Sequence, residues 1–105
     1  GFSQGTILSL FHFTKSKKSI GGLIGYSGLL FDNEMINKYD ITTPILLYHG
    51  QIDAVIQSSS SIEAKEILIK KGFDVECIIK KDLEHGIDEG GIIKGEEFII
   101  KKFNL

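Results

Sequence analysis

Two short apolar runs, each ending close to a glycine, limit most strongly how this chain of 105 residues can fold. Residues 20–26 run into Gly28 and residues 44–49 run into Gly50. Strands that are apolar on both faces are typical of parallel sheets covered by helices, so we expect both runs to be buried parallel strands. Residues 74–79 alternate between apolar and polar side chains, which predicts a third strand near a sheet edge.

Helical patterns lie around these strands. Residues 5–13 are densely apolar and predict a largely buried helix, whereas residues 89–103 predict a closing helix whose glycines weaken its start. Ser58–Ser61 offers capping oxygens for a helix that reaches about Lys71. Residues 29–43 predict an irregular segment with one helical turn near 33–38. This alternation predicts an α/β fold with about three parallel strands and flanking helices.

Composition limits the size of the core and the classes of partner. With 42% hydrophobic residues, the chain can bury one modest core, which fits one domain or part of one. A formal net charge of -2 provides no basic field for nucleic acid. No stretch reaches the roughly 20 apolar residues of a membrane span. The single cysteine, Cys77, excludes an intrachain disulfide, and we expect a cytoplasmic protein.

A candidate catalytic serine opens the chain. Residues 1–5, Gly-Phe-Ser-Gln-Gly, match the G-x-S-x-G nucleophile elbow, in which a serine occupies a tight turn between a strand and a helix. This pentapeptide also arises by chance, so an ordinary turn serine is the simplest alternative. Asp53 follows the second buried strand and His85 follows the third. The order Ser, Asp, His at strand carboxyl ends, where α/β sheets hold their sites, favours a catalytic triad.

Four motifs together resemble the phospholipase/carboxylesterase family, which includes acyl-protein thioesterases and small bacterial esterases. They are the elbow and the segments Tyr-Ser-Gly at 26–28, His-Gly-x-x-Asp-x-Val at 49–55 and His-Gly-Ile at 85–87. The resemblance spans nearly the whole chain. It implies that Ser3 is the nucleophile, His85 the general base and then acid, and Asp53 the group that orients His85. The backbone N–H of Gln4 would be one oxyanion-hole donor.

The chain also departs from the family pattern. Ala54 and Gln57 stand where the family often has prolines, and Thr6 stands where it prefers a small residue. These changes concern the rigidity of loops and leave the three catalytic side chains in place.

The resemblance implies that residues 1–105 are the C-terminal half of an α/β-hydrolase, a partial domain that begins at the elbow. We expect a serine hydrolase that cleaves small carboxylic esters or thioesters without a metal or an organic cofactor. The second oxyanion donor of this fold comes from a loop outside the sequence. We therefore expect the isolated segment to be inactive and to self-associate through an exposed strand edge. A noncatalytic assembly piece, and a peptidase or lipase on the same fold, are the alternatives.

Several other polar or apolar residues have simpler structural interpretations. His12 lies within the first predicted helix and His49 at a strand end, so both are expected to be structural, with His49 near the loop of the acid. Cys77 is expected to behave as a small buried hydrophobe. Residues 29–31, Leu-Leu-Phe, fit either an acyl pocket or the core.

Overall fold

The computed structural model describes residues 1–16, 18–31, 36 and 42–105. Its elements in chain order are α1 (Gln4–Lys15), β1 (Leu23–Tyr26), β2 (Ile45–Gly50), α2 (Ser59–Lys70), β3 (Val75–Lys80) and α3 (Glu89–Phe103). The strands form one parallel sheet in the order β1-β2-β3. The predicted α/β class, the three parallel strands and the edge position of the third strand are therefore confirmed.

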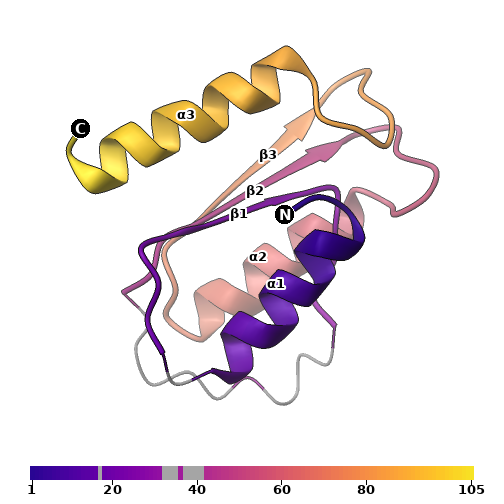
Figure 1. Ribbon diagram of the computed structural model, residues 1–105. Helices are drawn as coiled ribbons and strands as arrows, with labels where there is room; N and C mark the ends of the chain where they lie inside the picture. Colours follow the sequence, from indigo (N-terminus) through magenta and orange to yellow (C-terminus); the bar gives the residue numbers. More distant parts are fainter. Residues whose placement is uncertain (17, 32–35, 37–41) are drawn as a thin grey trace.

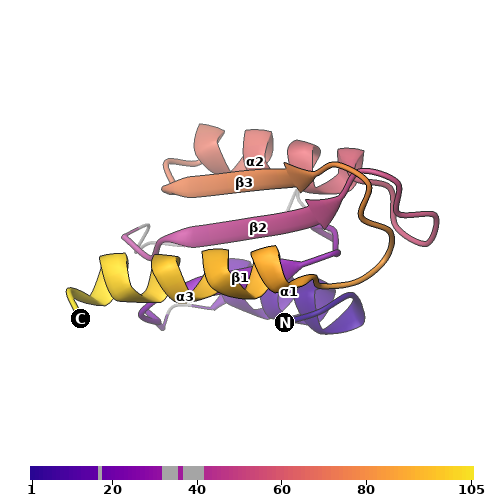
Figure 2. The same cartoon turned by 90° about the horizontal axis from the view of Figure 1, so that it is seen from above.

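The sheet lies between two layers of helices. Helix α3 covers one face, and α1 and α2 lie on the opposite face (Figure 1). Seen from above, the three strands run side by side and α3 passes over the β1 side of the sheet (Figure 2). All six residues of β2 are buried, because this strand has a neighbour on each side and helices on both faces. No helix in the described part of the chain is long and apolar enough to cross a membrane.

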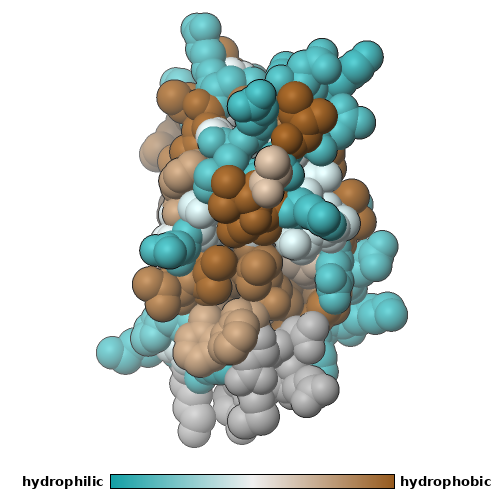
Figure 3. Space-filling model, turned by 90° about the vertical axis from the view of Figure 1, so that its right-hand side faces the viewer, coloured by the Kyte–Doolittle hydropathy of each residue, from teal (hydrophilic) through white to brown (hydrophobic). Residues whose placement is uncertain are grey.

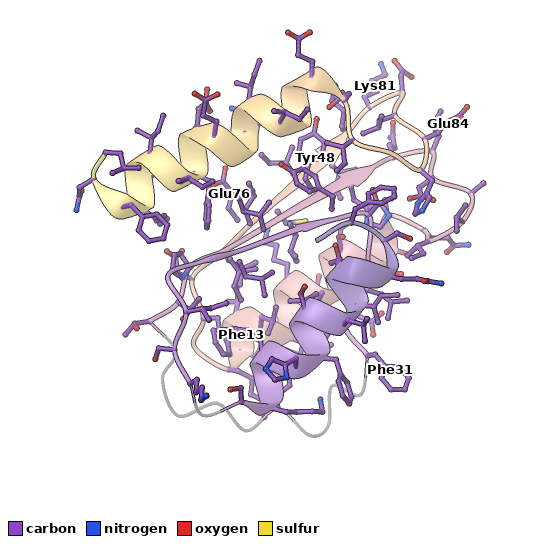
Figure 4. The ribbon with its side chains drawn as sticks, in the orientation of Figure 1. Phe13, Phe31, Tyr48, Glu76, Lys81 and Glu84 are labelled. Carbon is purple, nitrogen blue, oxygen red and sulfur yellow. The ribbon has the colours of Figure 1, made fainter. Side chains whose placement is uncertain are left out.

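The main core fills the space between the sheet and the pair α1 and α2. Phe13 points from α1 into this layer (Figure 4), and its ring centroid lies 5.7 Å from that of Phe73. Cys77 of β3 packs against the same cluster, in line with its expected role as a small apolar residue, and burial raises the pKa of its thiol. The buried members of the cluster are Leu10, Phe13, Leu23, Ile45, Leu47, Ala64, Leu68 and Phe73.

Helix α1 is less buried than its dense apolar sequence predicts. Only Thr6, Leu10, Phe13 and Thr14 are buried, and Leu8 is 67% exposed. An apolar run alone does not reveal which of its faces has a partner, and so the prediction of a largely buried helix is wrong. The helical turn expected near 33–38 falls largely outside the described residues.

The start of α3 rests on two tyrosines of the sheet. Tyr48 points from β2 toward α3 (Figure 4) and donates a hydrogen bond of 2.8 Å to Asp88, whose side chain caps the helix by accepting from the N–H of Gly91. A Cβ atom at Gly91 would lie 2.9 Å from the Tyr48 ring, and one at Gly95 would lie 2.5 Å from the Tyr26 hydroxyl. The glycines that weakened the sequence-based prediction thus allow the helix to approach these rings.

Candidate active site

Ser3 occupies a turn between a short extended segment and α1. Phe2 forms a parallel bridge with Tyr26, and the N–H of Ser3 donates to the Tyr26 carbonyl over 2.9 Å. Helix α1 then begins at the next residue. Ser3 has φ 53° and ψ -115°, a conformation that L side chains rarely adopt and that surrounding structure must hold in place. This abrupt change from strand to helix is the geometry that a nucleophile elbow requires.

Close packing around the elbow explains both its first glycine and the departure at Thr6. A Cβ atom at Gly1 would lie 2.7 Å from the carbonyl carbon of Gly5, so a larger residue would displace the turn. The buried Thr6 hydroxyl donates to the Tyr26 carbonyl over 2.8 Å. Its methyl group fills the space over Gly25 and Gly28, where added Cβ atoms would lie 2.7 and 2.4 Å away. These two glycines accommodate the threonine.

Asp53 lies in the loop that follows β2, with its side chain buried. Oδ1 accepts hydrogen bonds from the N–H groups of Val55 (2.8 Å) and Ile56 (2.9 Å). Burial on its own would raise the pKa of this carboxyl. The hydrogen bonds from His85, Ile56 and Val55 outweigh that effect and leave the pKa of Asp53 below its ordinary value. The carboxylate is therefore ionised at neutral pH.

His85 lies in the loop after β3, in contact with Asp53. Its Nδ1 is 2.7 Å from Asp53 Oδ2, and because a carboxylate only accepts, Nδ1 carries the proton. In the neutral ring, Nε2 is then the basic nitrogen. The side chain keeps 20% of its surface exposed, and its ring centroid lies 5.1 Å from that of Phe2.

The loop that carries His85 is fixed from two sides. The buried Ser27 hydroxyl donates to the Gly86 carbonyl over 3.1 Å, and Ser27 itself has a φ of 54°. At the end of β2, a Cβ atom at Gly50 would lie only 2.2 Å from the carbonyl oxygen of Glu84. This close approach requires glycine. The sequence analysis assigned no separate role to Ser27. The Ser-Gly pair directly after the strand is the signal that could have indicated a role in the site.

The structure thus joins two of the predicted site residues directly and places the third nearby. Asp53 and His85 share a hydrogen bond, and Phe2, the neighbour of Ser3, packs on the His85 ring. Within the described ranges no hydrogen bond joins Ser3 to His85. Gln4 is the first residue of α1, where N–H groups have no intrahelical acceptor. His49 lies buried beside the acid loop, as expected for a structural histidine.

The site lies on the face where the strands end. Figure 3 looks onto this face and shows apolar side chains gathered across its middle, with hydrophilic ones around them. The segments that reach this end of the sheet carry exposed apolar residues. These are Phe2 beside Ser3, Ile52 and Val55 in the loop of Asp53, and Ile87 in the loop of His85.

Comparison with known proteins gives consistent matches. A family model described as phospholipase/carboxylesterase matches residues 1–103. An acyl-protein thioesterase 1 homolog of Dictyostelium discoideum is 33% identical over 88 residues, 81% of this chain and 39% of the relative. The crystal structure of esterase PE8 superposes with a TM-score of 0.89 at 28% identity, over 96% of this chain and 47% of that one.

A third comparison concerns the fold alone. MGS-M1, an alpha/beta hydrolase enzyme from a Medee basin deep-sea metagenome library, has a TM-score of 0.80 at 19% identity over 100% of this chain and 53% of its own. The chain spans less than half the length of the curated relatives it matches.

Proposed function

Because this chain belongs to the phospholipase/carboxylesterase family, we propose that it carries the catalytic residues of a serine hydrolase that cleaves carboxylic esters or thioesters. The observation that carries the proposal is the 2.7 Å hydrogen bond between His85 and the buried Asp53, beside a serine held at φ 53°. A histidine oriented by a carboxylate next to a serine at a sharp turn is the arrangement of an activated nucleophile.

In the proposed reaction, the Ser3 hydroxyl attacks the acyl carbonyl while His85 Nε2 accepts its proton. Asp53 stabilises the imidazolium that forms, and the N–H of Gln4 donates to the developing oxyanion. The alcohol or thiol then leaves with the proton held by His85, which produces an acylated Ser3. Water, deprotonated by His85, releases the acid and restores the enzyme.

We propose further that residues 1–105 are part of a larger α/β-hydrolase domain. Grooves of about 400, 480 and 310 Å³ all border Ile24, and two of them also border Gly1. On α3, Ile92, Ile99 and Ile100 are exposed. Apolar surface of this kind beside residues 1–3, which pair with the outer side of β1, is what further strands would cover, and without them it would promote self-association.

The proposal is tested by substitution of Ser3 in the whole hydrolase domain that contains these residues. Ser3→Ala should lower kcat for p-nitrophenyl esters and S-acyl thioesters by a factor on the order of 10⁶. Ser9→Ala, which removes a hydroxyl bonded to the Gly5 carbonyl one helical turn away, is the matched control and should leave kcat within about twofold. Activity that survives Ser3→Ala would reject Ser3 as nucleophile.

The family match does not favour the noncatalytic assembly piece that the sequence left open. The substrate class can be determined in a competition assay that contains ester, thioester and other acyl substrates together. The preferred class is the one with the highest kcat/KM.

A further inference from the structure

His49 lies near the end of β2 and is fully buried, with its two ring nitrogens facing α2 and the loop of Asp53. Its Nδ1 is 2.6 Å from the hydroxyl of Ser61 in α2. Its Nε2 is 2.7 Å from the carbonyl oxygen of Ile56 and 3.3 Å from Asp53 Oδ2. Because both groups that face Nε2 are acceptors, Nε2 carries the proton, and in the neutral ring Nδ1 accepts from the Ser61 hydroxyl.

This arrangement fixes both backbone polar groups of Ile56. The carbonyl of Ile56 accepts from His49, and its N–H donates to Asp53 Oδ1. His49 also faces Oδ2, the same oxygen that accepts from His85. The carboxylate therefore has two backbone N–H donors on one oxygen and two imidazoles beside the other.

These hydrogen bonds fix residues 53–56 within the loop of Asp53. Residues 54 and 57 are alanine and glutamine, which leave the backbone torsions freer than proline would. Rotation of the Asp53 carboxylate would move Oδ2 away from His85. Loss of the His49 imidazole would leave the Ile56 carbonyl without its donor. A buried histidine that only filled space would not need to face both of these oxygens.

We infer that His49 is a positioning residue, which keeps the Asp53 carboxylate aimed at His85 by fixing Ile56 and by facing Oδ2. This inference rests on the proposed function for its effect on turnover. The placement of the loop is a separate property, because it depends on His49 whether or not Ser3 is a nucleophile.

Two amide substitutions of His49 test the inference in the whole hydrolase domain. In His49→Asn the amide reaches only to the place of Nδ1, so it keeps a partner in Ser61 and gives no donor to Ile56 or Asp53. In His49→Gln the amide nitrogen reaches the place of Nε2. We expect His49→Asn to lower kcat by about tenfold, the loss that one hydrogen bond to a neutral carbonyl would cause. KM should change by less than about twofold, and His49→Gln should retain kcat within about threefold.

Amide hydrogen exchange provides a second readout that needs no turnover. The N–H groups of Val55 and Ile56 should exchange about tenfold faster in His49→Asn than in the wild type, and at close to the wild-type rate in His49→Gln. His12→Asn, the same substitution in α1, is the control and should change neither kcat nor these exchange rates.

Equal kcat values for His49→Asn and His49→Gln, or unchanged exchange of Val55 and Ile56 in His49→Asn, would overturn the inference. Failure of the proposed function is recognised separately, as activity that survives Ser3→Ala. In that case the exchange rates alone still decide whether His49 holds the loop.

Discussion

The loops that follow β2 and β3 differ from the outer side of β1 in what surrounds their functional groups. In the loops, hydrogen bonds from Val55, Ile56 and His85 surround the buried Asp53 carboxylate. On the outer side of β1, the short segment that leads to Ser3 pairs with the strand. An apolar groove and exposed isoleucines of α3 also border β1 on this side. The acid is thus enclosed by hydrogen-bond partners, whereas the segment that leads to the proposed nucleophile lies beside exposed apolar surface.

The first prediction concerns Asp53, the acid of the proposed triad. Asp53→Asn retains an oxygen for the N–H groups of Val55 and Ile56, so the fold should persist. Its amide would donate toward His85 and favour the wrong tautomer, and we expect kcat of the whole domain to fall by about 10⁴-fold. Steady-state kinetics with a thermal melt as control would measure this. A loss below about tenfold would remove Asp53 from the triad.

The second prediction concerns the outer side of β1. The 105-residue chain alone should hydrolyse p-nitrophenyl esters at least about 10²- to 10³-fold more slowly than the whole domain, because one oxyanion donor would be absent. It should also associate through its strand edge and apolar α3 surface. Assays paired with sedimentation velocity test both points. A monomeric chain with the activity of the whole domain would contradict the comparison.

The third prediction concerns the hydrogen bond between Ser27 and the loop of His85. Removal of the Ser27 hydroxyl leaves the Gly86 carbonyl without its donor, and we expect Ser27→Ala to lower kcat by about tenfold. Ser27→Gly also lacks the hydroxyl but adopts a positive φ without strain. Both variants should therefore lose the same activity although their melting temperatures differ. If the loss of activity in the two variants instead parallels the loss in melting temperature, Ser27 contributes only to stability.

The smallest expected effect concerns the anchor of α3. Burial, together with the hydrogen bond to Asp88, raises the pKa of Tyr48 to about 12. The folded state therefore prefers the neutral phenol, and its contribution to stability is full below about pH 10, the ordinary value, and is lost as the pH rises toward 12.

Tyr48→Phe should lower the free energy of unfolding by about 1 kcal/mol at neutral pH, because one hydrogen bond is lost. It should also reduce the decline of stability between about pH 10 and 12. Urea unfolding of the wild type and the variant across this range measures both effects. An unchanged alkaline decline would show that other groups cause it.

Much of the fold follows from local patterns in the sequence. The continuous apolar run at 44–49 predicts the buried β2, and the alternation at 74–79 predicts the edge strand β3. The predicted bounds of α3, 89–103, coincide with those observed. The triad hypothesis also places Asp53 and His85 at neighbouring strand ends, and the structure joins them.

Contacts between distant segments could not be predicted in the same way. Ser58–Ser61 indicates a capped helix, yet Ser58 makes no side-chain cap bond and the Ser61 hydroxyl faces His49. Nothing near His49 in the sequence reveals that α2 supplies its partner. The exposed face of α1 and the tie between Ser27 and the loop of His85 likewise depend on which elements meet in space.

We propose Ser3 as the nucleophile, with His85 as its base and Asp53 as the partner of His85. Peptide mapping by mass spectrometry, after the whole domain has reacted with a fluorophosphonate probe, tests this claim. We predict a single adduct on Ser3 that forms rapidly in the wild type, at least about 10³-fold more slowly in Asp53→Asn, and not at all in Ser3→Ala. An adduct on another serine such as Ser27, or labelling that persists in Ser3→Ala, would contradict the claim.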